Sequence, residues 1–466
     1  MKNMKINNSQ FVHLHTHVEY SLFDGITSLS NMVLKAREMG FPALAITDHG
    51  NMGGAIKFMK ESISTKDKDD KPINFPPIKP ILGMEAYMSR DMRYHDNVGQ
   101  PEGRKGNYHL ILIAKNWKGY QNLCALSHKA FFEGFYMDPR IDLNLLSKHS
   151  EGLICQSACL KGLINQNLLH DRYDQAKKTA SLFKDIFGDG FFLEMMFHGI
   201  PEERQIIPDI MKLSSELDIP IIASNDVHYI NKGQALSQEV LMCMSTGTCL
   251  NDPKHLRHSY NEFYMKSAEE MMKIFKFCPQ ALTNTAAVSD MVDVKDIENG
   301  LFGKMRLPEF KVPEGFSGPQ QYVEKLAWDG MKKLGWDKSQ PHIDALKKEL
   351  EDTRIAKESN DYDFATYFLM VWDYTNFARE AGIPRGAGRG SGYASVLLRC
   401  LGVCYGADPI SNNLLWERFL GFDTKKFIKE SDFGFVEIRD VDGEDEEEDL
   451  AEVRDFESDP GGIDRY

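Results

Sequence analysis

Potential metal ligands stand at the ends of short apolar runs throughout the first half of the chain, and this placement limits the possible folds. His13 and His15 end the first run, His49 follows the second, and Asp226 and His228 follow the last. In a barrel of parallel strands, the carboxyl ends of the strands converge on one face, where active sites form. The pattern therefore predicts a barrel whose mouth gathers imidazole, carboxylate and thiol groups.

Apolar runs alternate with amphipathic stretches up to about residue 235. The sequence predicts strands over 11–15, 43–47, 78–88, 108–114, 152–156, 191–195 and 219–224, and helices over 30–39, 54–61, 120–132 and 201–217. Alternating strands and helices indicate an α/β domain with a parallel sheet. Because ligands from many strands have to meet in one place, we expect a (β/α) barrel rather than an open sheet.

The candidate ligands suit hydrolytic metal chemistry. His13 and His15 are two residues apart on an expected strand, so their side chains face the same side, and neutral imidazole suits zinc, iron and manganese. The carboxylate of Glu85, inside an apolar run, could bridge two ions. The other candidates are Asp24, His49, His109, Cys159, Asp226 and His228. Several ions held by such a set favour phosphoester hydrolysis.

The other histidines are expected to be packed or surface residues, because a lone histidine seldom binds a metal. This group contains His17, His95, His128, His149, His170, His255, His258 and His342.

Length and composition exclude few classes of protein. The 466 residues are enough for two or three domains. No run of 18 apolar residues is present, so we expect no membrane span. The first residues contain no apolar segment of a secretory signal. The cysteines form no Cys-x-x-Cys pair, and we expect a cytoplasmic protein with reduced thiols.

The charge is unevenly distributed along the chain. The formal net charge is −14, which taken alone argues against a nucleic-acid binder with a basic surface. Much of the excess is local, since every residue from Glu444 to Asp449 is acidic. We expect residues 426–466 to form a solvated, flexible tail. A nucleic-acid mimic or a metal sink is a less favoured reading of this tail.

A glycine-rich segment, RGAGRGSGYAS, spans residues 385–395 between two expected helices at 367–381 and 395–401. Glycines let backbone amides approach a phosphate, and a helix N-terminus adds a favourable dipole. Arg389 can fork to phosphate oxygens, and Ser391 can donate to one. Such loops are common, and many are plain turns, so the segment alone indicates phosphate binding only weakly.

Several segments of the first half resemble the PHP (polymerase and histidinol phosphatase) domain, in the version found in bacterial-type family C replicative DNA polymerases. They are FVHLHTHVEYSLFDG (11–25), AITDHGN (45–51), ILGMEAY (81–87), YHLILIAKN (108–116), GLICQSACL (152–160) and SNDVHY (224–229). The resemblance implies a distorted seven-stranded barrel that binds two or three divalent metals (Zn, Mn or Fe). The ligands it implies are His13, His15, Asp24, His49, Glu85, His109, Cys159, Asp226 and His228. Asp48, beside this set, is expected to orient a ligand.

The second half resembles the beginning of the family's α+β palm. The resemblance is carried by the glycine-rich segment together with YFLMVWDYTNFAREA (367–381) and LLWERFL (414–420). It implies that the triphosphate of an incoming nucleotide is gripped by Gly388, Arg389, Gly390, Ser391 and Ser395, with Mg²⁺ taking part once the palm is complete. Ala387 stands where the family usually has proline.

The acids of the family's palm are missing from the expected place. No Pro-Asp-Phe-Asp-x-Asp-like strand follows Leu420. Asp440 and Asp442 have a suitable spacing after an expected strand at 433–438, but they run into the acidic block, which favours a solvated turn. We therefore expect this chain alone to perform no template-directed synthesis.

These features predict a phosphoesterase domain over 1–285, a connector over 286–320, the N-terminal part of a palm over 321–425 and the acidic tail. Three functions compete. The first is the N-terminal portion of a replicative DNA polymerase with a 3′–5′ proofreading exonuclease, in which His13, His15, Asp226 and His228 are catalytic. Its partners would be primer–template DNA, deoxynucleoside triphosphates, a second polypeptide with the rest of the polymerase and other replisome proteins.

The second function is a free-standing phosphoesterase, which would need neither the glycine-rich segment nor LLWERFL. The third is a non-catalytic replisome scaffold with a structural metal site, because metal binding alone can supply folding free energy.

Overall fold

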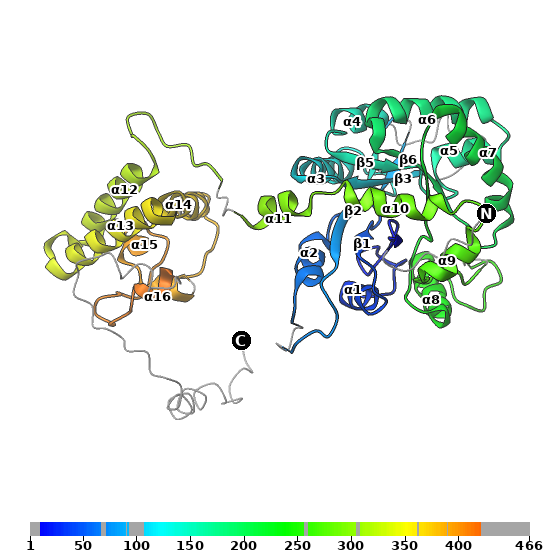
Figure 1. The fold of residues 1–466 in the computed structure, drawn as a ribbon. Helices are drawn as coiled ribbons and strands as arrows, with labels where there is room; N and C mark the ends of the chain where they lie inside the picture. Colours follow the sequence, from blue (N-terminus) through cyan, green and yellow to red (C-terminus); the bar gives the residue numbers. More distant parts are fainter. Residues whose placement is uncertain are drawn as a thin grey trace. The chain divides into compact units, whose positions relative to one another are not determined.

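The computed structural model describes residues 10–66, 71–89, 91–92, 107–255, 260–303, 308–360, 363–388 and 390–420. They form two compact units, which divide between Lys304 and Met305, inside the connector expected at 286–320. Figure 1 draws the ribbon of both units, and each unit has its own hydrophobic core.

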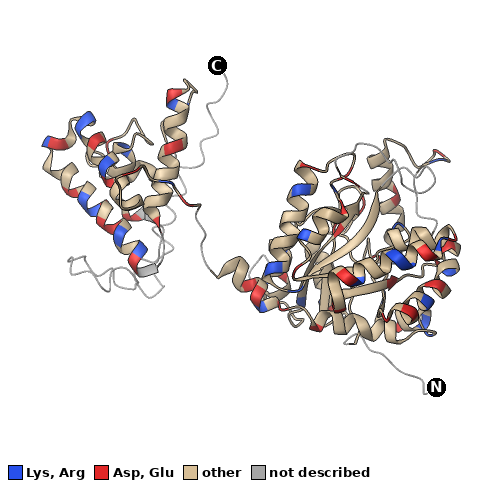
Figure 2. Ribbon diagram, turned by 90° about the horizontal axis from the view of Figure 1, so that it is seen from above, with Lys and Arg blue, Asp and Glu red and all other residues tan. Residues whose placement is uncertain are grey.

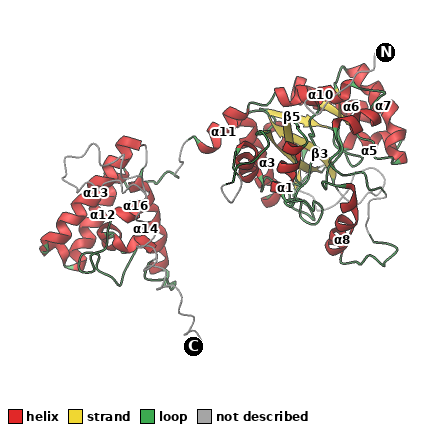
Figure 3. Ribbon diagram, turned by 60° about the horizontal axis from the view of Figure 1, so that its bottom comes forward, coloured by secondary structure: helices red, strands yellow, loops and turns green. Residues whose placement is uncertain are grey.

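The first unit is built on a seven-stranded mixed sheet (Figure 3). Its strands are β1 Ala43–Ile46, β2 Lys79–Met88, β3 Tyr108–Ala114, β4 Arg140–Ile141, β5 Leu153–Gln156, β6 Phe191–Met195 and β7 Ile221–Ala223. Their order is β1-β2-β3-β5-β6-β7, with β4 paired to β2. Strand β3 runs antiparallel to both its neighbours, while the other pairs are parallel. The expectation of an all-parallel sheet is therefore wrong at β3, whose first residues lie where the other strands end.

The N-terminal segment 11–18 closes this sheet. On one side, the amides of Ala45 and Thr47 in and after β1 donate to the carbonyls of His13 and Thr16, both over 2.9 Å. On the other side, after β7, His17 N donates to Val227 O over 2.7 Å. The sheet therefore curls into a distorted barrel, as the sequence predicted, although segment 11–18 forms only isolated bridges instead of the expected strand.

Helices cover the outside of the barrel (Figure 1). They are α1 Leu29–Glu38, α2 Ala55–Ile63, α3 Trp117–Phe132, α4 Leu143–Lys148, α5 Leu163–Leu169, α6 Tyr173–Phe187, α7 Pro201–Leu217, α8 Ala235–Thr246, α9 Ala268–Ile274, α10 Gln280–Asp290 and α11 Val294–Phe302, with short 3₁₀ turns η3 Gly188–Gly190 and η4 Lys232–Gln234. Helix α7 has proline at its first position and acids in its first turn, which favour a helix N-terminus. The four predicted helices correspond to α1, α2, α3 and α7.

Helices α10 and α11 belong to the first unit, although residues from 286 onward were expected to form a connector. Lys79 Nζ donates to Ser289 O over 2.6 Å, and Trp117 N donates to Asp296 Oδ2 over 2.8 Å. Val288 and Ile297 are fully buried in the first core. The apolar residues of this stretch pack against the barrel, and this packing offsets the conformational entropy that the stretch loses when it is ordered.

The second unit is helical over its described residues. Its elements are α12 Pro319–Leu334, η5 Trp336–Lys338, α13 Gln340–Asn360, α14 Phe364–Glu380, η6 Gly390–Ala394, α15 Val396–Cys400 and α16 Glu417–Leu420. Residues 421–466, which include the expected strand at 433–438, Asp440, Asp442 and the acidic tail, lie outside the described residues.

Lysines, arginines and acids alternate along the surface helices of both units (Figure 2). Among the residues that the structure describes, no helix combines the length and the apolar character needed to cross a bilayer.

Candidate metal centre

All the predicted ligands except His13 converge at the mouth of the barrel, and His17 joins them. His15 and His17 come from the N-terminal segment and Asp24 from the loop after it. The others come from β2 (Glu85), the start of β3 (His109) and the residues that follow β1, β5 and β7 (His49, Cys159, Asp226 and His228). We call this set the mouth cluster.

The Glu85 carboxylate lies at the centre of the mouth cluster. Its Oε1 lies 2.6 Å from Nδ1 of His109, and its Oε2 lies 2.7 Å from Nδ1 of His49 and 3.4 Å from Nε2 of His17. Its two oxygens thus face different imidazoles, which is the arrangement expected of a bridging carboxylate.

Two aspartates complete the cluster on either side. Asp226 Oδ1 lies 3.1 Å from His15 Nε2 and 3.3 Å from His17 Nε2. Asp24 Oδ2 lies 3.2 Å from His49 Nε2, and its Oδ1 lies 3.5 Å from His228 Nε2.

A thiol completes the donor set, since Cys159 Sγ lies 3.7 Å from Nδ1 of His109. The backbone is left-handed at Asp226 (φ 43°), at Ala158 before Cys159 (φ 63°) and at Phe23 before Asp24 (φ 63°). Such conformations are costly for non-glycine residues and are typical of functional sites.

His13 lies apart from the mouth cluster, so the prediction that it pairs with His15 there is wrong. Its Nε2 donates to the carbonyl of Lys266 over 2.8 Å, and its ring packs edge-on against Phe11 and Phe41. The sequence contains two overlapping His-x-His pairs, and the barrel mouth lies at the carboxyl end of the segment. That position selects His15 and His17, and could have been used to choose between the pairs.

Hydrogen bonds to Nδ1 orient the rings of His15 and His17 so that their Nε2 atoms face one another. Ser21 Oγ donates to Asp48 Oδ1 over 2.5 Å, so it accepts from Nδ1 of His17, 2.8 Å away. Asp48 thus orients a candidate ligand, in the role expected for it. Glu194 accepts from Nδ1 of His15 over 2.8 Å. The two Nε2 atoms lie 3.1 Å apart, close enough for a shared proton or a shared cation to join them.

The cluster fits divalent metal ions on two further observations. His49 Nδ1 and Asp226 Oδ1 are buried and have no hydrogen-bond partner of acceptable geometry, and buried polar atoms are rarely left unsatisfied. Three groups of side chains place ligand atoms within 4.8 Å of one another: His15, His17 and Glu85; His49, Glu85 and His109; His17, His49 and His228. Imidazole, carboxylate and thiol donors suit zinc, iron or manganese.

Electrostatics favour the ligand form of some of these groups and the protonated form of others. Burial lowers the pKa of His15 and His49, but the carboxylates of Asp226 and Glu85 outweigh burial and raise the pKa of His15 well above its usual value and that of His49 to about 10, so a cation has to displace a proton there. Burial opposes ionisation of Asp226, but His15 and His228 outweigh burial and hold the pKa of its carboxyl well below the usual value. Burial, together with nearby His49 and His228, lowers the pKa of His17 to about 3. Burial, with Glu85 and Asp226, raises the pKa of the Cys159 thiol well above its usual value, so its thiolate needs a cation.

Glu194 is a site residue that the sequence prediction missed. Its carboxylate is buried in β6, accepts from His15 and also accepts from the hydroxyl of Ser224. A lone acid inside the apolar strand FFLEM was the available signal, because buried carboxylates need partners.

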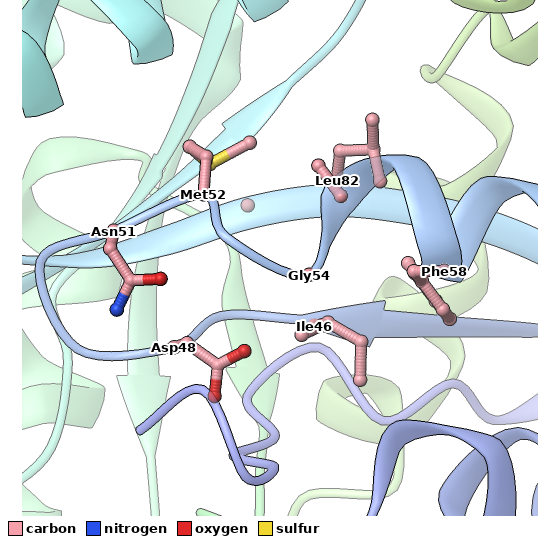
Figure 4. Close-up of a pocket in the computed structure, with 9 residues that line it drawn as sticks. Ile46, Asp48, Asn51, Met52, Gly54, Phe58 and Leu82 are labelled. Atoms are coloured by element: carbon pink, nitrogen blue, oxygen red, sulfur yellow. The ribbon is translucent and has the colours of Figure 1, made fainter. Parts of the chain in front are cut away.

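A small pocket beside the mouth cluster is a separate feature (Figure 4). It is lined mostly by apolar side chains, and Asp48 is the charged residue among its lining residues. Oδ1 of that carboxylate accepts from Ser21 Oγ and from Val18 N, so this oxygen is already engaged within the unit.

The glycine-rich segment of the second unit is described except for Arg389, which lies outside the described residues. Gly388 and Gly390 have φ values of 139° and 59°, which favour glycine. Ser391 is exposed.

Ser395 is buried at the N-cap of α15, where its hydroxyl donates to Glu349 and accepts from Leu398 N. Its predicted place at the triphosphate is therefore corrected, because both hydrogen-bonding directions of the hydroxyl are used inside the unit.

Two protein-family models match this chain. Residues 13–198 match the PHP domain, and residues 321–433 match the bacterial DNA polymerase III alpha NTPase domain. The PHP match contains most of the mouth cluster, while Asp226 and His228 lie beyond it.

Curated relatives span both units. The DNA polymerase III subunit alpha of Borreliella burgdorferi is 40% identical over 417 residues, which cover 88% of this chain and 34% of that protein. Its namesake from Helicobacter pylori strain 26695 is 39% identical and covers 89% of this chain and 34% of its own length.

The Thermus aquaticus subunit is 32% identical over 96% of this chain and 40% of its own length. The chain thus spans about a third of the length of the first curated relatives. The chain therefore carries a PHP domain followed by a bacterial DNA polymerase III alpha NTPase domain, and over most of its length it is similar to part of the DNA polymerase III alpha subunits.

Proposed function

We propose that the first unit is a metal-dependent phosphoesterase that removes nucleotides from the 3′ end of DNA, as a proofreading exonuclease within a replicative polymerase. The single observation that carries this proposal is the mouth cluster, in which a central carboxylate, imidazoles, aspartates and a thiol all present donor atoms to one buried region. The names of the relatives support DNA as the substrate, and the chemistry of the cluster supports phosphodiester cleavage.

The roles of the side chains follow from their contacts. His15, His17 and Asp226 would hold one ion, and His49 and His109 a second, with Glu85 between them. Bound divalent ions would supply positive charge that polarises a phosphodiester and lowers the pKa of water. The contacts from Glu194 to His15 and from Ser21 to His17 keep the imidazole rings in place while substrate enters, which limits the reorganisation that the reaction requires.

The second unit is proposed to contribute to nucleotide binding. Gly388, Arg389, Gly390 and Ser391 would face the triphosphate, while Ser395 acts only through the helix that it caps. Synthesis would require palm acids, with Mg²⁺, from the part of the polymerase that corresponds to the remaining length of the relatives, together with primer–template DNA.

The proposed function is tested by release of a labelled nucleotide from the 3′ end of an oligonucleotide, with Mn²⁺ or Zn²⁺ added to the purified chain. We expect release that stops on chelation and returns when metal is restored, and that is absent from Asp226→Ala. Cleavage of a small phosphoester but not of DNA would instead support a free-standing phosphoesterase. Bound metal with no cleavage of either substrate would support a structural site.

Exposed aromatic side chains at the C-terminal end of α3 are suited to holding an unpaired DNA end. Phe132 and Phe135 are 79% and 51% exposed. Phe132 ends α3 and Phe135 follows it. In the same helix, Ser127 Oγ donates to the carbonyl of Gly50, directly after His49, over 3.1 Å. Unpaired bases stack on aromatic rings regardless of sequence.

Replacing Phe132 by alanine should therefore weaken binding of single-stranded DNA by about 1–3 kcal/mol, the usual contribution of one stacked base. The measurement is the KM for a labelled single strand, with metal content as the control. Phe277→Ala, which truncates another partly exposed ring of the same unit after α9, should leave KM unchanged. An unaltered KM in Phe132→Ala would exclude this surface from DNA binding.

A further inference from the structure

Asn225, directly before the candidate ligand Asp226, has its side chain fully engaged. Its Nδ2 donates to the carbonyls of Glu262 and Tyr264 over 2.9 and 2.8 Å. Its Oδ1 accepts from Nζ of Lys266 over 3.0 Å. Asn225 is buried, with 2% exposure, so these contacts are made away from solvent. The residue therefore ties the turn that carries Asp226 to the segment 262–266.

Lys266 is an ammonium group buried beneath this turn. The residue is 1% exposed, and its Nζ also donates to the carbonyl of Glu262, lies 3.2 Å from the carboxylate of that residue and sits 4.2 Å from the centre of the Tyr264 ring. Its own carbonyl accepts from His13. Burying an ammonium group is expensive, and an apolar side chain often serves stability as well. Stability alone therefore does not account for a lysine here.

The contacts of the neighbouring residues converge on the same turn. Asp226 has a left-handed backbone, which the surrounding structure has to enforce. The carbonyl of Asn225 accepts from Nε2 of His198 over 3.0 Å, and His228 N donates to the carbonyl of Phe263 over 2.9 Å. The turn with Asp226 and His228 is thus held by His198 and by segment 262–266.

We propose that Lys266 and Asn225 are positioning residues of the metal centre. Lys266 fixes the side chain of Asn225, and Asn225 holds Asp226 and His228 in the geometry that a divalent cation requires. Neither residue offers a ligand atom to the cluster. Contacts that orient metal ligands are typically worth about 10- to 100-fold in metal affinity.

The test is Lys266→Met, which keeps the length of the side chain but removes the ammonium group. In the full chain, titration with Co²⁺ followed by visible absorption should show about 10- to 100-fold weaker binding. Thermal unfolding of the metal-free protein is expected at a lower temperature, because the groups that Lys266 serves lose their donor, so affinity is measured where the variant is still folded. A merely structural lysine would lower thermal stability and leave the Co²⁺ affinity unchanged.

Lys79→Met is the matched control. In the wild type, Nζ of Lys79 also donates to a backbone carbonyl, that of Ser289, and both residues lie in the same unit as Lys266. Neither Lys79 nor Ser289 contacts a member of the mouth cluster through a described hydrogen bond or ion pair, so its Co²⁺ affinity should remain at the wild-type value.

A double variant decides whether Lys266 acts through Asn225. If it does, Lys266→Met in an Asn225→Ala background should cost no further affinity. The inference is overturned if Lys266→Met binds Co²⁺ as tightly as wild type, if the two losses multiply, or if the wild-type chain binds no Co²⁺. It rests on the metal binding in the proposed function and not on DNA cleavage. A wild-type chain that binds Co²⁺ without releasing nucleotides would therefore refute the exonuclease and leave this inference standing.

Discussion

Replacing His17 by glutamine should abolish release of nucleotides from DNA 3′ ends, whereas the same replacement at His13 should leave it nearly intact. Nε2 of His17 lies within 3.4 Å of acceptor or ligand atoms of His15, Glu85 and Asp226, so a metal ion would lose a direct ligand. The loss of metal affinity should exceed about 100-fold, the upper range for groups that only orient ligands. Metal content and 3′-end release of the purified variants are the measurements.

His13→Gln is the control because it is the same chemical change two residues away. The glutamine amide can still donate to the carbonyl of Lys266, so the fold and the turn at Asp226 should be retained. Equal loss of metal in both variants would show that the N-terminal segment as a whole, and not His17, determines binding. Full activity in His17→Gln would remove this imidazole from the proposed site.

Replacing Glu349 by alanine should destabilise the second unit by about 3 kcal/mol or more, since each buried donor left without an acceptor costs about 1–3 kcal/mol. Glu349, in α13, is buried and accepts from the hydroxyl of Ser395 and the amides of Val396 and Leu397, each over 2.8 Å. These amides begin α15, directly after the glycine-rich segment. Chemical unfolding can be followed by the fluorescence of the second unit's tryptophans, Trp328, Trp336, Trp372 and Trp416.

The stability of this unit should also fall as the pH rises towards neutrality. Burial raises the pKa of Glu349 to about 7, although its three hydrogen bonds favour the ionised form. The folded state therefore binds a proton more tightly than the unfolded state. The stabilisation is complete below the unfolded value of about 4.5 and is lost as the pH rises through about 7, over a range of about 3 kcal/mol.

Glu349→Gln isolates this contribution, because glutamine keeps an acceptor for the helix and does not titrate. The difference in unfolding free energy between the wild type and this variant should change with pH between about 4.5 and 7 and level off above. A difference that is independent of pH would mean that Glu349 is not the titrating group.

The barrel and its ligand positions could be predicted from the sequence because both follow from local patterns. Apolar runs such as 108–114 and 191–195 are long enough to identify strands, and a ligand next to each run marks the mouth. The direction of β3 could not be predicted, since strand pairing depends on contacts between residues far apart in the chain. His109 reaches the mouth only because β3 is reversed.

The errors in the site prediction have the same physical origin. His13, His15 and His17 share one side of an extended segment, so alternation alone cannot decide which pair reaches the mouth cluster. The role of Ser395 was misassigned because its partner, Glu349, lies 46 residues earlier in the sequence. Glu194 was missed because its role depends on a histidine 179 residues away.

The hydrogen bonds of segment 11–18 to β1 and to Val227 close the barrel between its first and last strands. His15 and His17 lie on segment 11–18, and Asp226 and His228 lie on the segment that follows β7. An ion bound between them would therefore link the two segments that close the barrel. Joining parts of a chain so far apart in sequence restricts mainly the unfolded ensemble. Removal of such an ion should therefore first increase local unfolding where segment 11–18 meets Val227, under conditions in which the rest of the barrel stays folded.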